Sequence, residues 1–141
     1  MDRATARRLI ERLNLDAERL AGDFGLRYQS ITAERVGVRT RYGVCYADGA
    51  IRIRLRHATN GRPLKYSSLV NTLCHELAHL RHFNHGPRFK AFYFEILEHA
   101  RALGVYCPGR PQIVAARLPA RPPVRRPAAV PGPQQLSLFG T

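Results

Sequence analysis

The sequence contains little cysteine, little lysine, little acidic charge and no tryptophan. Its three cysteines form an odd number without a C-x-x-C pair, which argues against a disulfide framework and a cysteine-based zinc ribbon. No stretch is long and apolar enough to cross a bilayer, and the first residues lack the apolar core of a secretory signal. We therefore expect a cytoplasmic protein without a membrane partner.

Negative charge is scarce, because 23 Lys and Arg residues outnumber 10 Asp and Glu residues and the net charge is +13. Only Lys65 and Lys90 are lysines, so arginine supplies nearly all of the positive charge. Such a basic surface favours polyanions, and DNA is the partner we expect. Alternatively, the positive charge keeps the protein soluble, or it surrounds a binding site for acidic substrates. A length of 141 residues, 45% of them hydrophobic, leaves room for one small folded domain.

Hydrophobic spacing predicts an α+β domain over residues 1–107, beginning with a surface helix at about residues 5–21. Between about residues 26 and 56 the spacing changes to two, which predicts strands of a short antiparallel sheet with one buried face. A hairpin turn is expected at residues 47–49. The alternating apolar residues are Val36, Val38, Ile51, Ile53 and Leu55.

Two further helices are predicted, at about residues 65–81 and 87–103. In the first, one side is apolar and faces the core, while the opposite side carries two histidines and faces a cleft. Gly86 and Pro87 separate the two helices, because Gly permits unusual φ angles and Pro favours a first helical turn. The expected buried positions of the last helix are Phe89, Phe92, Ile96 and Leu97, and Gly104 is its expected C-cap.

The helix at residues 65–81 contains a metal-binding pattern. His75 and His79 are four residues apart, which places both imidazoles on one face, about 6 Å apart along the axis. This spacing suits two ligands of one tetrahedral ion. Glu76 lies about 100° around the helix, where it can reach a water on the metal without being a ligand. The pattern predicts a catalytic site with one Zn²⁺ ion.

A third ligand must come from outside this pair. We favour His85, because it follows the helix break and the chain can fold back there. His82 is the alternative, but in a regular helix it lies roughly 10 Å along the axis from His75. Three protein ligands leave a fourth position open for water, as in catalytic zinc sites. His57 and His99 have no comparable placement and are expected to be ordinary surface residues.

These residues predict a metal-dependent hydrolase. Water at the metal becomes more acidic, Glu76 accepts its proton, and the hydroxide attacks a polarised carbonyl. Glu76 then delivers the proton to the leaving amine. A further group must stabilise the oxyanion. Its candidates are Tyr66, Tyr93 and His82.

Residues 42–97 resemble the SprT-like and YgjP-type metallopeptidases, a group of compact zincins. The matching segments are 42–45, 50–55, 75–79 and 84–86, with Phe89. The resemblance implies a zincin-like fold and a zinc metallopeptidase. It also implies zinc bound by His75, His79 and His85, with Glu76 catalytic.

The sequence departs from the SprT-like pattern in one turn, and it departs further from a second family with similar histidine spacing. Tyr42 and Val44 stand where the SprT-like turn usually has Trp and Ser. The spacing of the three histidines also matches the metzincins, but that clan has Gly at the position of His82 and a Met-turn after the site. The sequence has Met1 as its only methionine, so we set the metzincin interpretation aside.

After Cys107 the composition changes. Residues 108–133 are rich in Pro, Ala and Arg and contain no acidic or aromatic residue, which predicts a flexible, disordered linker. Its arginines either contact DNA or keep the segment solvated. These are Arg110, Arg117, Arg121, Arg125 and Arg126.

Residues 134–141 contain a short motif that resembles the bacterial sliding-clamp-binding pentapeptide at all five positions. It consists of Gln135, Leu136, Ser137, Leu138 and Phe139. The resemblance implies a sliding-clamp partner, with apolar side chains filling a cleft and Gln135 supplying hydrogen bonds. The alternative is an apolar terminus that packs back on the domain.

The leading hypothesis is a clamp-tethered zinc protease that acts on proteins at or near DNA. Eukaryotic relatives of the SprT type digest proteins crosslinked to DNA and carry a clamp-binding peptide, so the resemblance implies this substrate class. Two alternatives belong to other classes. One is a non-catalytic DNA-binding clamp adaptor with structural zinc, and the other is a metal-dependent hydrolase of a non-protein amide.

Overall fold

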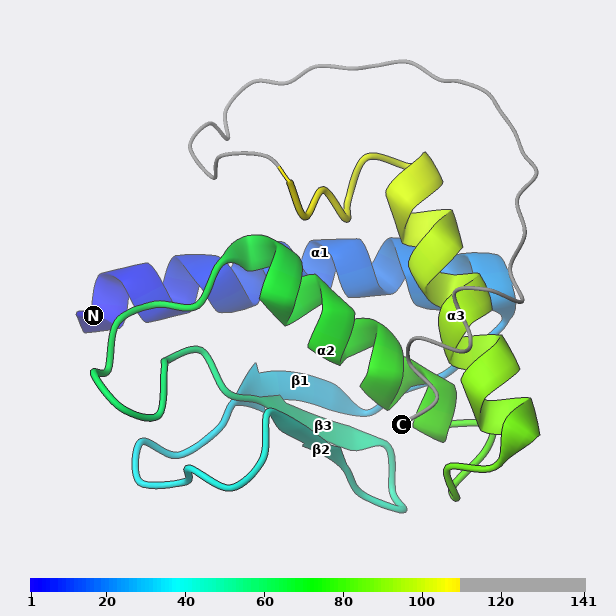
Figure 1. The fold of residues 1–141 in the computed structure, drawn as a ribbon, viewed down its shortest axis with the longest axis horizontal. Helices are drawn as coiled ribbons and strands as arrows, with labels where there is room; N and C mark the ends of the chain where they lie inside the picture. Colours follow the sequence, from blue (N-terminus) through cyan, green and yellow to red (C-terminus); the bar gives the residue numbers. More distant parts are fainter. Residues whose placement is uncertain (110–141) are drawn as a thin grey trace.

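The computed structural model describes residues 1–109, which form three helices and a three-stranded sheet (Figure 1). The elements are α1 (Arg3–Phe24), β1 (Ser30–Ala33), β2 (Gly43–Cys45), β3 (Ala50–Ile53), α2 (Tyr66–His79) and α3 (Pro87–Ala102). The predicted α+β class and the three predicted helices are confirmed. None of these helices combines the length and apolar character that a bilayer crossing requires. Residues 110–141, which include most of the predicted linker and the whole predicted clamp-binding peptide, lie outside the described residues.

The sheet has the strand order β1-β3-β2 and is mixed. β2 and β3 form the expected antiparallel hairpin, and Gly49 in its turn has a φ of 93°, which favours glycine. β1, however, pairs parallel with β3. The prediction of a wholly antiparallel sheet is therefore wrong at β1. After β1 the chain skips the neighbouring position in the sheet and returns as β2, which runs antiparallel to β1. β3 then fills the position between them and runs in the same direction as β1.

The strand predicted around Val36 and Val38 is also wrong. β1 lies earlier, at Ser30–Ala33, and Val36 is 73% exposed in a turn. The N–H of Val38 donates to the carbonyl of Arg35 (3.1 Å), which closes this turn. Alternation of apolar and charged residues over so short a stretch does not distinguish a strand from an exposed turn.

The core lies between the helices and one face of the sheet. α1 and α2 both pack on this face, and α3 packs against α2 (Figure 1). Apolar side chains at helical spacing on α2 meet side chains at spacing two on the strands, and all of them are almost fully buried. They are Leu69, Leu73 and Leu77 from α2, with Ile31, Ile51 and Ile53 from the sheet. The other face of the sheet carries no helix within residues 1–109.

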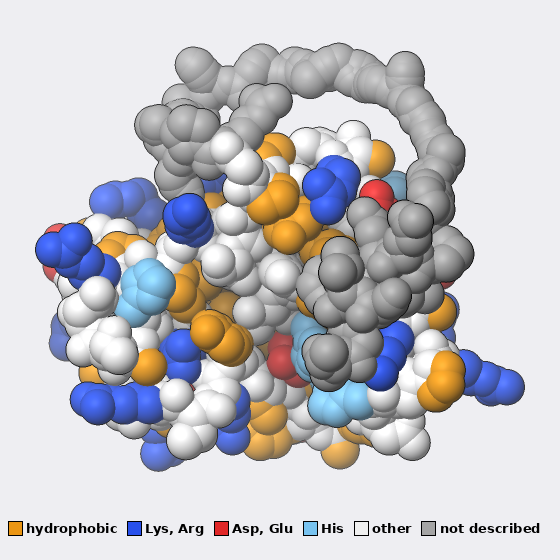
Figure 2. Space-filling view, viewed as in Figure 1, with side chains coloured by type: hydrophobic (Ala, Val, Ile, Leu, Met, Phe, Trp, Pro, Cys, Tyr) orange, Lys and Arg blue, Asp and Glu red, His pale blue; other side chains and the backbone are white. Residues whose placement is uncertain are grey.

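Basic side chains are unevenly distributed over the face of the molecule shown in Figure 2. In Figure 2, Lys and Arg side chains gather at the end of the molecule where the β1–β2 loop and the loop between β3 and α2 lie in Figure 1. Arg54 at this end is only 8% exposed, and its guanidinium donates to the carbonyls of Arg39, Arg41 and Arg56 at 2.9–3.2 Å. The bonds to Arg39 and Arg41 fix the β1–β2 loop against the end of β3.

Candidate metal centre and active site

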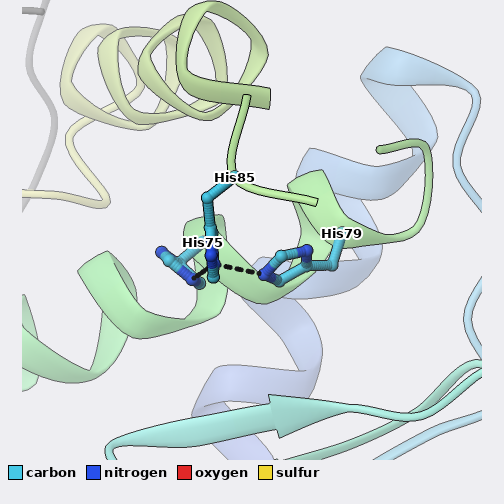
Figure 3. Close-up of side chains that lie close together, drawn as sticks. All are labelled: His75, His79 and His85. Carbon is cyan, nitrogen blue, oxygen red and sulfur yellow. Dashed lines mark hydrogen bonds between the residues drawn. The ribbon is translucent and has the colours of Figure 1, made fainter. Parts of the chain in front are cut away.

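The two helices and the segment between them bring three histidines together (Figure 3). His75 and His79 lie one turn apart on α2, on the side opposite its buried leucines. After His79 the chain forms a tighter helical turn, in which the N–H groups of Arg81 and His82 both donate to the carbonyl of Ala78. The chain then turns back before α3, and His85 points toward the pair on α2.

The imidazole nitrogens converge at distances that suit a single metal ion. Nε2 of His85 lies 3.0 Å from Nε2 of His79 and 3.3 Å from Nε2 of His75. One nitrogen from each ring lies within 4.8 Å of the other two. Tetrahedral zinc with bonds of about 2.0–2.1 Å would separate its nitrogen ligands by roughly 3.3 Å. The donor set therefore fits one small tetrahedral cation.

The charge state of His75 and the tautomer of His79 also suit metal binding. Burial, together with the neighbouring charges of His79 and His85, lowers the pKa of His75 to about 4, so this ring is neutral near pH 7. Burial also lowers the pKa of His79. Nδ1 of His79 lies 3.0 Å from the carbonyl oxygen of His82. A hydrogen on Nδ1 donates to this carbonyl, which leaves the Nε2 lone pair directed at the centre.

Aromatic rings from α3 form a wall behind the histidines. Phe89 stacks on His79 with ring centroids 4.4 Å apart and meets His75 and His85 edge-on at 4.9 Å. Tyr93 meets His75 at 5.2 Å, and its hydroxyl donates to Asn71, one turn before His75 on α2. These contacts restrict the imidazoles to orientations in which their nitrogens meet.

Glu76 directly follows His75 on α2 and is buried, with only 5% of its surface exposed. Burial raises its pKa to about 7, against the opposing charge of Arg41. A carboxyl group with this pKa exchanges protons readily near neutral pH. It faces β2, since a Cβ placed on Gly43 would lie 3.1 Å from Oε2 of Glu76.

The outer edge of β2 presents backbone groups next to Glu76. The N–H of Arg54 donates to the carbonyl of Tyr42, and the N–H of Tyr46 donates to the carbonyl of Ala50. Hydrogen-bonded pairs alternate along an antiparallel ladder, so the N–H and C=O groups of Gly43 and Cys45 point away from β3. β2 is an edge strand of the sheet. These groups are therefore positioned to pair with an extended chain.

The other candidate residues occupy different places. The hydroxyl of Tyr66 donates to Asp16 of α1 (2.5 Å), and Tyr66 precedes His75 by about 13 Å along the helix, so it does not belong to the site. The His82 ring packs on Phe92, and only its carbonyl reaches the histidine cluster. Of the three oxyanion candidates, the structure places only the ring of Tyr93 against a clustered histidine.

Two histidines expected to be surface residues lie away from the cluster. His57 is exposed in the loop after β3, and His99 on α3 contacts Asp23 of α1 at 2.8 Å. The carbonyl of His82 also supports His79, a role that no residue pattern in the sequence indicates. Every residue has a carbonyl, so no side-chain pattern could have revealed this role.

Comparisons with known proteins agree with this site. Residues 1–103 match the sequence profile of the YgjP-like family, described as a metallopeptidase domain. No curated protein matches the sequence. Among solved structures, Wss1 from Saccharomyces cerevisiae is similar with a TM-score of 0.68 and 18% identity, over 73% of this chain and 82% of that chain.

Wss1 from S. pombe is similar as well, with a TM-score of 0.61 and 22% identity, over 74% of this chain and 90% of that chain. These identities are low, so the two structures establish a shared fold. The profile match covers most of the chain and includes all three histidines and Glu76. It also implies a divalent metal, for which the histidine cluster is suited. The chain belongs to the YgjP-like metallopeptidase family.

Proposed function

We propose that this metallopeptidase is a zinc enzyme that cleaves proteins at or near DNA, with the metal held by His75, His79 and His85. The observation that carries the proposal is the convergence of three imidazole nitrogens beside the buried carboxyl group of Glu76. Neutral imidazoles are common zinc ligands, and three of them leave a coordination position for water or substrate. Bound zinc supplies Lewis acidity, which polarises a carbonyl and makes water more acidic.

Glu76 is the proton carrier in this proposal. Its carboxylate accepts a proton from the attacking water and delivers the proton to the nitrogen of the departing amine. Two features support this role: a pKa raised to about 7 by burial, and a position one residue after His75 that faces β2. Tyr93 and Phe89 hold the histidine rings in place and exclude water from one side of the site.

The edge of β2 suits a polypeptide substrate. An extended peptide can pair with the outward backbone groups of Gly43 and Cys45, which places its main chain beside Glu76. Such pairing uses main-chain groups that every polypeptide has, and a small non-protein amide would leave most of them unused. This edge therefore favours a protein substrate over the small-amide alternative.

Gly43 provides a test of this geometry. In Gly43→Ala the added methyl would lie 2.7 Å from Cγ2 of Thr72, 3.1 Å from the carbonyl oxygen of Arg52 and 3.1 Å from Oε2 of Glu76, so the strand or the two side chains of α2 must shift. A displacement on the order of 1 Å at a reacting group can lower the rate about a hundredfold. We expect kcat/KM for an unfolded protein substrate to fall by about tenfold to a hundredfold.

Gly37→Ala is the matched control, because a Cβ at Gly37 meets no atom within 4 Å and no strained φ is involved. It should retain the activity of the unmodified protein. Thermal unfolding of both variants shows whether they are folded at the assay temperature. Full activity in a folded Gly43→Ala protein would contradict the close approach of β2 to the reacting groups.

The basic surface supports the location at DNA. A net charge of +13 favours polyanions, and on the face shown in Figure 2 most Lys and Arg side chains gather toward one end. DNA bound there would hold a DNA-bound protein close to the peptidase site and so raise its local concentration. Free proteins would lack this advantage.

The decisive assay compares one protein substrate in two states, crosslinked to DNA and free in solution. The zinc-loaded full chain should cleave the crosslinked form faster at low salt, and the difference should shrink as salt is raised, since phosphate contacts are salt-dependent. Equal rates on both forms at all salt concentrations would remove DNA from the proposed function. Absence of cleavage of any protein would favour the adaptor alternative.

We further propose that the C-terminal residues Gln135 to Phe139 recruit the enzyme to the sliding clamp, and thus to the replisome. The support is the complete match of this pentapeptide to the clamp-binding pattern. A peptide spanning residues 134–141 should bind a bacterial clamp, as measured by fluorescence anisotropy. Leu138→Ala with Phe139→Ala should weaken binding at least about thirtyfold, because apolar anchors carry most of the energy of such peptides. If the double-alanine peptide bound with unchanged affinity, the pentapeptide would not be a clamp-binding motif.

A further inference from the structure

A basic cavity lies apart from the histidine cluster. It has a volume of about 320 Å³ and lies between the β1–β2 loop (residues 34–42) and the loop that follows β3. Four arginines line it, and neither the three clustered histidines nor Glu76 does so. These arginines are Arg35, Arg39, Arg54 and Arg56.

The one carboxylate in the cavity wall does not offset this charge. Glu34 has a fully buried side chain, and its oxygens contact Arg41 at 2.7 Å and Arg52 at 3.8 Å. The N–H of Arg35 also donates to it (3.2 Å). Glu34 is thus paired with arginines that do not line the cavity, so the positive charge inside is left uncompensated.

The loop that carries the exposed arginines is held in place. The buried guanidinium of Arg54 donates to the carbonyls of Arg39 and Arg41, which belong to this loop. Arg35 and Arg39 themselves are exposed at the cavity rim. Exposed guanidinium groups on a fixed loop suit phosphate, whose oxygens accept two parallel hydrogen bonds.

Two exposed tyrosines lie on the open face of the sheet, and one of them, Tyr42, contacts an arginine that lines the cavity. The Tyr42 ring is 59% exposed and packs on the Arg54 guanidinium, 4.4 Å from its ring centroid. Tyr46 is 39% exposed, with Arg52 at 5.6 Å. Exposed aromatic rings next to arginines bind unstacked nucleic-acid bases, which duplex DNA does not offer.

We propose that single-stranded DNA binds along this surface, with phosphates at Arg35 and Arg39 and a base stacked on Tyr42. This assignment rests on the proposed function, because it names the form of DNA that holds the substrate. It also places the DNA-binding surface next to the peptidase site at Glu76. Tyr42 directly precedes Gly43, whose backbone faces Glu76, so a protein attached to the bound strand would lie at the peptide-binding edge.

The test measures binding of the zinc-loaded full chain to fluorescent oligo-dT and to a duplex of equal length. Tyr42→Ala should weaken oligo-dT binding at least about fivefold, the lower range for one lost stacking contact, while Tyr42→Phe should retain it. Arg35→Ala with Arg39→Ala should also weaken binding. The slope of log K against log salt should then fall by roughly 1.4, because each single-strand phosphate contact contributes about 0.7.

The control is Arg19→Ala with Arg27→Ala, which removes two exposed arginines that do not line the cavity. All variants keep residues 108–141, so the arginines there contribute equally. The proposal is overturned if the control loses as much affinity as the cavity pair, if Tyr42→Ala binds normally, or if the duplex binds more tightly than oligo-dT. Peptidase activity is not measured, so a failure here is distinguishable from failure of the proposed function.

Discussion

Glu76→Gln should lower kcat/KM for a protein substrate by about 10²–10⁴-fold, the range for loss of a general acid–base group. The amide has nearly the shape of the carboxyl group but neither accepts nor delivers a proton at neutral pH. Glu76 is 5% exposed, and burial of its carboxylate raises its pKa, so replacement by a neutral group should not lower the melting temperature. The loss would therefore be one of chemistry, with the fold intact.

Glu95→Gln serves as the comparison for this variant, since it makes the same substitution at an exposed position of α3. It should cleave at the rate of the unmodified protein. Zinc content should be unchanged in both variants, because neither residue is a proposed ligand. Retention of most of the activity by Glu76→Gln, measured on the same preparation, would overturn the role of Glu76 as proton carrier.

His85→Ala should lower zinc affinity at least about a hundredfold and remove peptidase activity. Loss of a group that only supports a ligand already costs 10–100-fold, so loss of a ligand should cost more. Nε2 of His85 lies within 3.3 Å of the Nε2 atoms of both other histidines, which makes it the common neighbour of the set. Titration of the metal-free protein against a competing chromophoric chelator measures the change.

His82→Ala is the matched comparison for His85→Ala, because the sequence offers His82 as the alternative third ligand. Its carbonyl, which accepts from His79, is retained in the alanine variant. Zinc affinity should therefore stay close to that of the unmodified protein. The opposite pattern, with affinity lost in His82→Ala and kept in His85→Ala, would show that the chain between the helices is arranged differently around the metal.

The helices and the histidine cluster could be predicted because their signals are local. The pair His75 and His79 depends only on helical spacing, and the return of His85 depends on the break at Gly86 and Pro87. The parallel pairing of β1 with β3 is different. It joins Ser30 to Ala50, and nothing within either segment specifies the direction of so distant a partner.

Arg54 shows a second limit of local patterns. Arg54 directly follows β3, and the alternation of the strand continued to this position places it on the polar face, where an arginine is expected to be solvated. Instead it is 8% exposed, because its guanidinium donates to two backbone carbonyls of the β1–β2 loop, those of Arg39 and Arg41, and to the nearby carbonyl of Arg56. The same long-range folding brings Gly43 against Glu76. Such contacts depend on loop paths that side-chain periodicity does not encode.

The division of the three histidines between a helix and the connector after it has a consequence for stability. An ion held by all three would close a ring of fewer than a dozen residues, joining the end of α2 to the beginning of α3. The metal would thus act as a crosslink as well as a reagent, and proteolytic nicking between the helices should slow as the ion is added. Cellular zinc supply would then govern how long the enzyme persists, alongside how fast it works.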